Sequence, residues 1–232
     1  MAQLLNFSES IGLHAHAEPE SLAAADLDRS MTFRQWNTRA RRLANGLLGL
    51  GLDKGDRVGV LAYNRIEWLE IYAAVAKAGL VAVPVNFRLV APEILFILHD
   101  CYARAVIVEE TLFGPIEEIR GDLPFGSDAI IQIGGTAPAG CTGYEDLIAR
   151  GADSEPGVPV APSDTWCLMY TSGTTGKPNG AIRSHGAGAL LSVSTDVELG
   201  FSRRDAGLLV MPMCHANSLY FMGALTYCSA LV

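Results

Sequence analysis

The chain has 232 residues, of which half are apolar and 18% are charged, a composition typical of a globular protein and not of a disordered one. Its formal net charge of −8 excludes nucleic acid as an expected partner, because nucleic-acid-binding domains carry a basic surface. The sequence shows neither a signal peptide nor an apolar stretch long enough to span a membrane, so we expect a cytoplasmic location.

The first clear helix signal begins near residue 32. Thr32 and Gln35 have the spacing of a capping box, and Trp36 then starts a run of apolar residues at helical spacing that ends at Gly51. A solvated helix face explains the arginines of this segment better than a phosphate-binding surface does. These arginines are Arg39, Arg41 and Arg42.

Strand and helix signals then alternate. Residues 56–63 have the apolar content of a buried strand, and the spacing of Asn64 and Glu67 predicts a second capped helix that ends at Gly79. Pro92 at a first helical position opens a third helix. Further strands are predicted over residues 80–85, 105–108 and 129–133.

Strands that alternate with helices indicate βαβ units, so the expected fold class is α/β, with a mainly parallel sheet flanked by helices. Residues 134–143 and 151–164 are predicted loops, because both are rich in Gly, Pro and small polar residues. A loop inside one domain is expected for the second stretch, with a domain boundary near residue 160 as the alternative. Residues 165–171 then predict a strand, and a helix can begin at Ser184.

The cysteines and two N-terminal histidines have no spacing typical of a metal site, and no metal ligands are assigned. No C-x-x-C pair occurs and most of the cysteines lie in apolar runs, which favours buried free thiols over disulfides or ligands. His14 and His16 are expected at the surface. The cysteines are Cys101, Cys141, Cys167, Cys214 and Cys228.

The most informative segment is Tyr170-Thr-Ser-Gly-Thr-Thr-Gly-Lys-Pro-Asn-Gly-Ala181. It lies between a predicted strand and a predicted helix, where glycines permit unusual backbone conformations and hydroxyl groups add donors. Such a loop suits the binding of a polyphosphate, and a surface linker is the alternative. The predicted phosphate loop consists of Thr171, Ser172, Gly173, Thr174, Thr175, Gly176 and Lys177.

Two common nucleotide-binding motifs do not fit this segment. Gly173 and Gly176 are only three positions apart, and Lys177 precedes Pro178 instead of Ser or Thr, so the segment is not a P-loop. No G-x-G-x-x-G follows a strand, and a dinucleotide-binding fold therefore has no support.

The segment resembles the phosphate-loop signature of the adenylate-forming superfamily, which includes acyl- and aryl-CoA synthetases, peptide-synthetase adenylation domains and firefly luciferase. Weaker similarity extends along nearly the whole chain, through Thr32-Phe33, Gly55-Asp-Arg-Val58, and Gly79 with Pro84-Val-Asn86. The resemblance implies that residues 1–232 are the N-terminal part of the AMP-binding large domain, without its C-terminal remainder and small lid domain.

A second match is Met211-Pro-Met-Cys-His215-Ala-Asn217, which resembles the family segment whose histidine lies near the acyl carboxylate and the adenylate. His215 is therefore a candidate substrate-binding residue. The alternative is a histidine that only contributes to the core.

The family's reaction implies ATP, Mg²⁺ and coenzyme A. A carboxylate attacks the α-phosphate of ATP to give an acyl-adenylate and pyrophosphate, and a thiol then displaces AMP. By this resemblance, residues 171–177 would hold the β- and γ-phosphates through backbone amides and hydroxyls. The carboxylic acid itself is not identified by the sequence.

Two departures from the family pattern limit these implications. The family usually has Pro-Lys-Gly where this chain has Pro178-Asn179-Gly180, so a cation near the phosphates is missing unless Lys177 replaces it. The later family motifs, Tyr-Gly-x-Thr-Glu and Thr-Gly-Asp, do not occur in these residues, and most groups that bind magnesium, together with those that bind ribose, are expected downstream.

The expected function is therefore that of the N-terminal fragment of an ATP-dependent acid–CoA ligase that is incomplete as a catalyst by itself. A non-catalytic nucleotide-, acyl- or protein-binding module and a peptide-synthetase adenylation fragment stay open as alternatives. The mean hydropathy of +0.25 and the apolar stretch from residue 208 to 232 also suggest self-association through exposed apolar surface.

Overall fold

The computed structural model describes residues 6–171, 178–202, 205–215 and 229–231. Its main feature is a seven-stranded sheet in the order β7-β6-β5-β3-β4-β8-β9, in which every neighbouring pair is parallel except β8 with β9. The strands are β3 (Arg57–Leu61), β4 (Val81–Pro84), β5 (Ala103–Glu109), β6 (Ile130–Ile133), β7 (Thr142–Gly143), β8 (Thr165–Thr171) and β9 (Asn179–Ser184).

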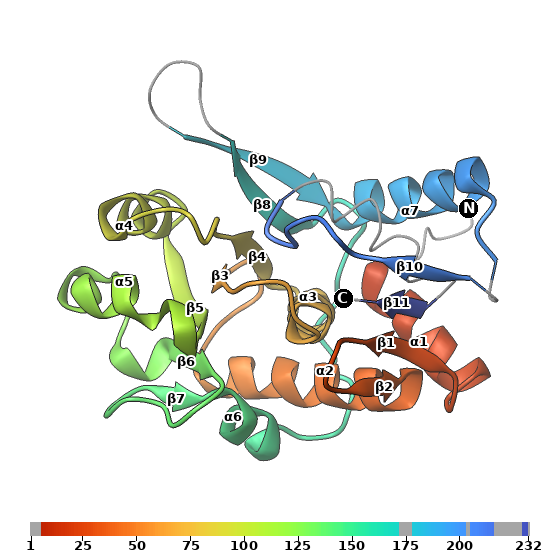
Figure 1. The fold of residues 1–232 in the computed structure, drawn as a ribbon, viewed down its shortest axis with the longest axis horizontal. Helices are drawn as coiled ribbons and strands as arrows, with labels where there is room; N and C mark the ends of the chain where they lie inside the picture. The colour runs from red at the N-terminus through yellow and green to blue at the C-terminus, as the bar shows by residue number, and fades with distance from the viewer. Residues whose placement is uncertain (1–5, 172–177, 203–204, 216–228, 232) are drawn as a thin grey trace.

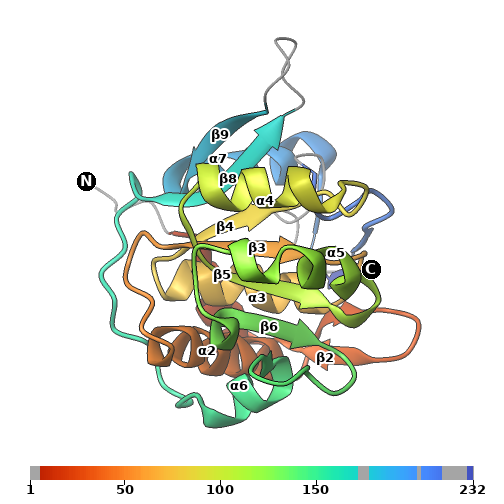
Figure 2. The ribbon, with the colours of Figure 1, turned by 90° about the vertical axis from the view of Figure 1, so that its left-hand side faces the viewer.

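Helices cover both faces of this sheet (Figures 1 and 2), which confirms the predicted α/β class. The helices are α1 (Phe7–Ala17), α2 (Phe33–Gly49), α3 (Glu67–Lys77), α4 (Ala91–Asp100), α5 (Phe113–Glu118), α6 (Tyr144–Arg150) and α7 (His185–Leu199). Short 3₁₀ turns occur at Glu110–Leu112, Arg120–Asp122 and Ser127–Ala129.

The two faces of the sheet build separate apolar cores, because successive strand residues point to opposite sides. Val58 and Val60 of β3 pack in the core that contains α2 and α3, whereas Leu61 packs in the core that contains α4 and α5. Gly59 lies between the two valines, and a Cβ atom there would come within 2.7 Å of Leu98 in α4. A larger residue at this position would therefore have to displace the buried Leu98 side chain.

A second, four-stranded sheet lies beside α1 and α7 (Figure 1). Its order is β10-β11-β1-β2, with β1 and β2 antiparallel and the other pairs parallel. None of its strands had a sequence signal strong enough to be predicted, because each is only three or four residues long. They are β1 (Leu22–Ala25), β2 (Ser30–Thr32), β10 (Ala206–Leu208) and β11 (Ser229–Leu231).

The predicted start of α2 is confirmed in detail. The Thr32 hydroxyl accepts a hydrogen bond from the Gln35 amide at 3.2 Å, and the Gln35 side chain accepts one from the Thr32 amide at 2.8 Å. For α4, by contrast, the predicted boundary was one residue late: the helix begins at Ala91, and Pro92 is its second residue.

The prediction of a solvated arginine face on α2 was wrong for Arg39 and Arg41. Arg39 lies between Glu70 of α3 and Glu145 of α6, with N–O distances of 2.7 and 2.6 Å. Arg41 contacts Asp153 in the connector after α6 at 2.6 Å. These side chains join α2 to three other parts of the fold, an arrangement that charge spacing within one helix cannot indicate.

The connector over residues 151–164 has no helix or strand, as predicted, and it leads into β8 of the same sheet. The strand prediction for residues 165–171 is confirmed. The β9 strand was not predicted, because residues 179–184 are mostly exposed and lack an apolar pattern.

The four cysteines in the described part of the chain are free thiols, of which Cys141 is partly exposed and the others are buried. This agrees with the prediction of free thiols; Cys228 lies outside the described residues. Burial raises the pKa of the Cys167 thiol to about 12 and that of Cys101 to about 11. Within the described ranges, none of the helices has the length and apolar character that crossing a membrane requires.

Candidate active site

The predicted phosphate loop begins at the carboxyl end of β8. Thr171 is the last residue of this strand, while the other predicted phosphate-binding residues, 172–177, lie outside the described residues. Thr171 and Asn179 are directly paired across the β8–β9 hairpin. The side chains of such a pair emerge on the same face of the sheet, so a residue at position 179 projects beside the first residue of the loop.

The loop end of this hairpin is tied to α4 by a side-chain contact. The Tyr170 hydroxyl donates a hydrogen bond to an Asp100 carboxylate oxygen at 2.5 Å. The pKa of Tyr170 is raised above its usual range, first by burial and then by this hydrogen bond, which requires the phenol proton. The strand residue that immediately precedes Thr171 is therefore fixed to the neighbouring helix.

His215 lies near the carboxyl end of β4, the strand that pairs with β8. Its Nε2 atom is 3.5 Å from the Asn86 amide nitrogen, and the residue is exposed. The Asn86 amide is oriented by its oxygen, which accepts a hydrogen bond from the Arg88 backbone amide at 3.0 Å. Its nitrogen therefore faces His215 and can donate to a neutral ring whose proton is on Nδ1.

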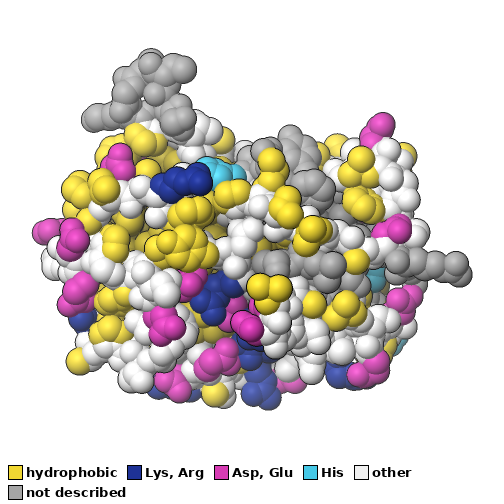
Figure 3. Space-filling view, in the orientation of Figure 1, with side chains coloured by type: hydrophobic (Ala, Val, Ile, Leu, Met, Phe, Trp, Pro, Cys, Tyr) yellow, Lys and Arg dark blue, Asp and Glu magenta, His cyan; other side chains and the backbone are white. Residues whose placement is uncertain are grey.

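On the side of the molecule that Figure 3 shows, a histidine side chain is exposed beside a Lys or Arg side chain and apolar side chains. The structure thus brings two separately predicted features, Thr171 and His215, to the carboxyl ends of two adjacent parallel strands. Ligands of open α/β sheets bind at this edge.

Asn64 has a different role from the one its spacing predicted. The α3 helix has Ile66 at its N-cap position without a side-chain cap, so the predicted capping box with Glu67 was wrong. The Asn64 amide nitrogen instead donates to the backbone oxygens of Leu209 and Met211, at 3.1 and 2.9 Å. Its oxygen accepts from the Met213 amide at 2.8 Å.

A hydrogen bond and two buried side chains also fix the segment that leads to His215. The Tyr72 hydroxyl donates to the Met213 backbone oxygen at 3.2 Å, and the side chains of Met213 and Cys214 are buried. Burial raises the pKa of the Cys214 thiol. His215 is therefore the exposed residue that follows a short buried anchor.

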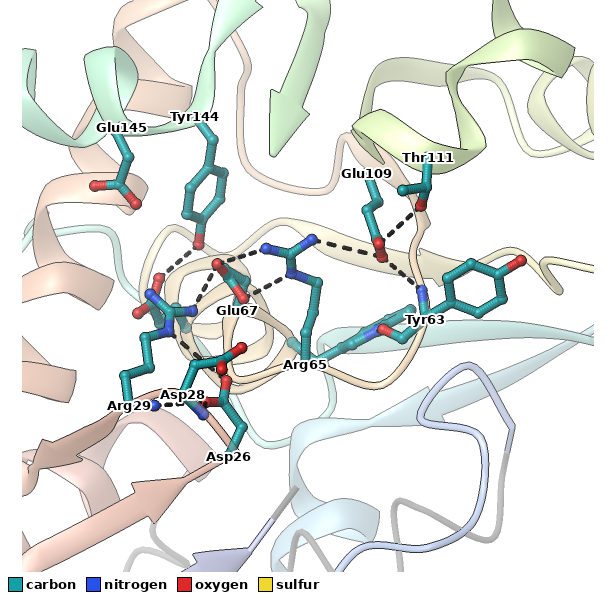
Figure 4. A network of polar contacts seen from close by, with 12 residues as sticks. Asp26, Asp28, Arg29, Tyr63, Arg65, Glu67, Glu109, Thr111, Tyr144 and Glu145 are labelled. Carbon is teal, nitrogen blue, oxygen red and sulfur yellow. Dashed lines mark hydrogen bonds and ion pairs between the residues drawn. The ribbon is translucent and has the colours of Figure 1, made fainter. Parts of the chain in front are cut away.

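Charged side chains occupy the topological switch point of the sheet, which is the place where an open α/β sheet usually binds its ligand. The connections that leave the adjacent strands β3 and β5 run in opposite directions along the sheet, to β4 and to β6, so ligands would be expected between the ends of β3 and β5. Glu109 at the end of β5 instead accepts a hydrogen bond from the Tyr63 amide at 2.9 Å and lies 3.5 Å from Arg65 (Figure 4). This position is filled internally, which leaves the ends of β4 and β8 as the candidate site.

A cavity of about 360 Å³ lies at the other edge of the sheet, where the strands begin. Lys54 and Asp164 line it and are paired to each other at 2.7 Å. Its lining includes neither Thr171 nor His215, so it is separate from the candidate site. Among the described residues, no group of three or more His, Cys, Asp or Glu side chains could hold a metal ion.

The sequence interpretation missed Asn64, Asp100 and Tyr170 as residues that shape this site. A signal for Asn64 was present: it lies three residues after the end of a buried strand, at the sheet edge where the phosphate loop also starts. Asp100 and Tyr170 lie 70 positions apart, and no local pattern relates them.

Comparison with known proteins places these features in a family. A family model described as "AMP-binding enzyme" matches residues 13–232. The chain is 37% identical over 207 residues to a long-chain-fatty-acid–CoA ligase of Mycobacterium tuberculosis, covering 89% of this chain and 39% of the relative. It is 35% identical over 193 residues to a medium-chain-fatty-acid–CoA ligase of Ectopseudomonas oleovorans, covering 80% of this chain and 35% of the relative.

Solved structures agree with the sequence comparison. The anthranilate–CoA ligase AuaEII in complex with anthranoyl-AMP superposes with a TM-score of 0.91 at 29% identity, over 100% of this chain and 46% of that chain. An inhibitor-bound N-terminal domain of FACL13 from Mycobacterium tuberculosis has a TM-score of 0.84 at 31% identity, over 97% of this chain and 56% of that one. The chain therefore spans about two fifths of the length of the curated relatives it matches, and the predicted superfamily resemblance is confirmed.

Proposed function

This chain belongs to the AMP-binding enzyme family, and we propose that residues 1–232 are the N-terminal part of the large domain of an ATP-dependent carboxylic acid–CoA ligase. In the first half-reaction, a carboxylate oxygen attacks the α-phosphorus of ATP, and pyrophosphate leaves with the electrons of the broken P–O bond. In the second, the sulfur of coenzyme A attacks the acyl carbonyl carbon, and AMP leaves. The thiol proton is released to solvent or to a base.

One juxtaposition carries this proposal. Thr171, where the predicted phosphate loop starts, and His215, the candidate acyl-site residue, lie at the carboxyl ends of the adjacent strands β8 and β4. A ligase of this kind needs an anion-binding loop and a carboxylate-binding group close together, because the carboxylate must approach the phosphate in line with the leaving group.

In this proposal, residues 171–177 bind the β- and γ-phosphates with backbone amides and hydroxyls. Asn179, which shares a face with Thr171, adds hydrogen-bond donors at the base of the loop but no positive charge. His215 orients the acid. The Asn86 amide nitrogen lies 3.5 Å from its Nε2 atom, which leaves Nδ1 as the ring nitrogen that would donate to the carboxylate.

Magnesium enters the proposal as the usual partner of ATP. The described residues do not offer a cluster of ligands that could hold the ion, so no step is assigned to it here. Coenzyme A is the proposed thiol, because the similar proteins are named CoA ligases. The acid is proposed no more narrowly than a fatty or aryl carboxylic acid, since relatives of both kinds match, including an indoleacetate–CoA ligase of Aromatoleum aromaticum at 33% identity.

Calorimetric titration can test the proposal with two probes, inorganic pyrophosphate and an acyl-sulfamoyl adenosine, which mimics an acyl-adenylate. Lys177→Ala should weaken the binding of pyrophosphate, because it removes a cation from the phosphate loop. His215→Ala should weaken the mimic and leave pyrophosphate unaffected. His16→Ala, at an exposed position of α1, is the matched control. If both probes bind the wild type and the variants equally, the proposed site is wrong.

A further inference from the structure

We propose that Asn64 is the positioning residue of this site, which holds the backbone of residues 209–213 so that His215 faces Asn86. The inference rests on the proposed function of His215. It starts from the amide of Asn64, whose nitrogen and oxygen together bind three backbone groups that lie 145 to 149 positions away in the sequence.

The segment needs such a partner because it has no regular structure of its own. The β10 strand ends at Leu208, and residues 209–215 belong to no helix or strand. Backbone groups outside helices and sheets must find other partners when they are shielded from water. The Asn64 side chain is the hydrogen-bond partner of backbone groups of Leu209, Met211 and Met213. The Tyr72 hydroxyl binds the backbone oxygen of Met213 as well. Met213 is thus held at both its amide and its carbonyl, two residues before His215.

The same turn also contacts the other half of the His215–Asn86 pair. The ring of Tyr63 packs against the ring of Phe87, with centroids 4.8 Å apart. Phe87 directly follows Asn86. Two consecutive residues of the turn after β3 therefore contact both segments. Tyr63 contacts the segment that bears Asn86, and Asn64 contacts the segment that bears His215.

The turn itself is braced by charged groups (Figure 4). Arg65 makes two hydrogen bonds to Glu67, at 2.8 and 3.0 Å, and lies 3.5 Å from Glu109. Glu109 in turn accepts the Tyr63 amide, and Arg29 approaches Glu67 at 2.6 Å. A support fixed on several sides can transmit a defined position to its partners, which a freely moving loop cannot do.

The test compares Asn64→Ala and Asn64→Asp with a matched control in the same chain. Asn45 also uses its amide to hold a loop, donating to the backbone oxygens of Ala152 and Ser154 at 2.8 Å each. Asn45→Ala therefore removes comparable hydrogen bonds away from the candidate site. Two readouts are followed without any ligand: alkylation of Cys214 by iodoacetamide, resolved by peptide mass spectrometry, and nuclear Overhauser contacts between the His215 ring and the Asn86 amide.

In the wild type and in Asn45→Ala, we expect slow labelling of Cys214 and a measurable contact between His215 and Asn86. In Asn64→Ala, labelling of Cys214 should rise on the order of tenfold, because the three hydrogen bonds through which Asn64 holds its segment are lost. The His215–Asn86 contact should disappear, while the fully buried Cys167 stays unlabelled and reports that the fold is intact.

Asn64→Asp keeps the acceptor for Met213 but places a carboxylate against two backbone oxygens, so it should also release the segment. If Cys214 is labelled in Asn64→Asp as slowly as in the wild type, or if the His215–Asn86 contact survives in Asn64→Ala, the positioning role is refuted. Because neither readout involves ATP or an acid, this result is independent of the pyrophosphate and adenylate-mimic titrations that test the proposed function.

Discussion

The Tyr170 hydroxyl donates a 2.5 Å hydrogen bond to the Asp100 carboxylate and so joins the end of β8 to the end of α4. Tyr170→Phe removes this bond without changing the ring. We expect a loss of roughly 1 kcal/mol in the free energy of unfolding, at the low end for a charged acceptor because the pair is partly exposed to water. Urea denaturation measures it, with Tyr102→Phe, at a mostly exposed tyrosine, as the control. Equal midpoints for the two variants would mean that the contact contributes nothing.

Asn179 offers a direct test of the phosphate loop. Asn179→Lys places an ammonium group on the face shared with Thr171, and we expect pyrophosphate to bind about tenfold more tightly, with a smaller gain at high salt. Leu27→Lys adds the same charge on the fully exposed β1–β2 turn and should have no effect.

The role of Lys177 follows from a double-mutant cycle with the same variant. If Lys177 replaces the family's usual lysine, Lys177→Ala should weaken pyrophosphate binding more in the natural chain than in Asn179→Lys. Calorimetry on the four combinations measures the coupling energy. The phosphate-loop assignment fails if neither substitution changes the affinity.

A further prediction concerns the catalytic activity of residues 1–232 when they are tested alone. We expect no ATP–pyrophosphate exchange with fatty or aryl acids, because the later motifs expected to bind magnesium and ribose do not occur in these residues. The measurement is isotope exchange with purified protein, using the Lys177→Ala variant to exclude contaminating ligases. Exchange that is robust in the wild type and absent in this variant would contradict the expectation.

His185 makes stability depend on pH. It is fully buried against Trp166, neither ring nitrogen has a hydrogen-bond partner among the described residues, and burial lowers its pKa from 6.5 to about 4. Below pH 6.5 the unfolded chain takes up this proton while the folded chain does not. The contribution of neutral His185 to the free energy of unfolding is thus fully present above pH 6.5. It is lost as the pH falls toward 4, by as much as about 3 kcal/mol.

The variant that isolates this effect is His185→Leu. Between pH 6.5 and 4 its free energy of unfolding should fall less than that of the wild type, as measured by urea denaturation at each pH. His16→Leu, at an exposed histidine of α1, should behave like the wild type. Parallel pH profiles for all three proteins would show that His185 does not titrate as described.

The exposed face of α7 should drive self-association. Leu190, Val193 and Val197 lie at helical spacing and are 59%, 55% and 75% exposed, which forms an apolar stripe. We propose that this stripe contributes to contacts between copies of the chain, and that Val193→Glu with Val197→Glu lowers the associated fraction in light scattering. Leu27→Glu introduces a charge at an isolated exposed leucine and is the control. A wild type that stays monomeric at high concentration contradicts the proposal.

Local chemistry in the sequence was sufficient for much of the framework. The Thr32 capping box, the strand that ends at Thr171 and the helix that Ser184 caps all depend on residues a few positions apart, and all are present. The phosphate-loop composition and the segment that contains His215 likewise indicated the family from short runs of residues.

Tertiary structure alone decided how these pieces act together. Asn64 has capping spacing, yet its amide binds residues 209–213, because the packing of β10 and the segment after it brings unpaired backbone groups within its reach. Asn86 and His215 are 129 positions apart and meet where Asn64 and Tyr72 hold the backbone of residues 209–213. Residue spacing indicates which local hydrogen bonds are possible. The hydrogen bonds that form also depend on which backbone groups, distant in the sequence, are packed nearby without another partner.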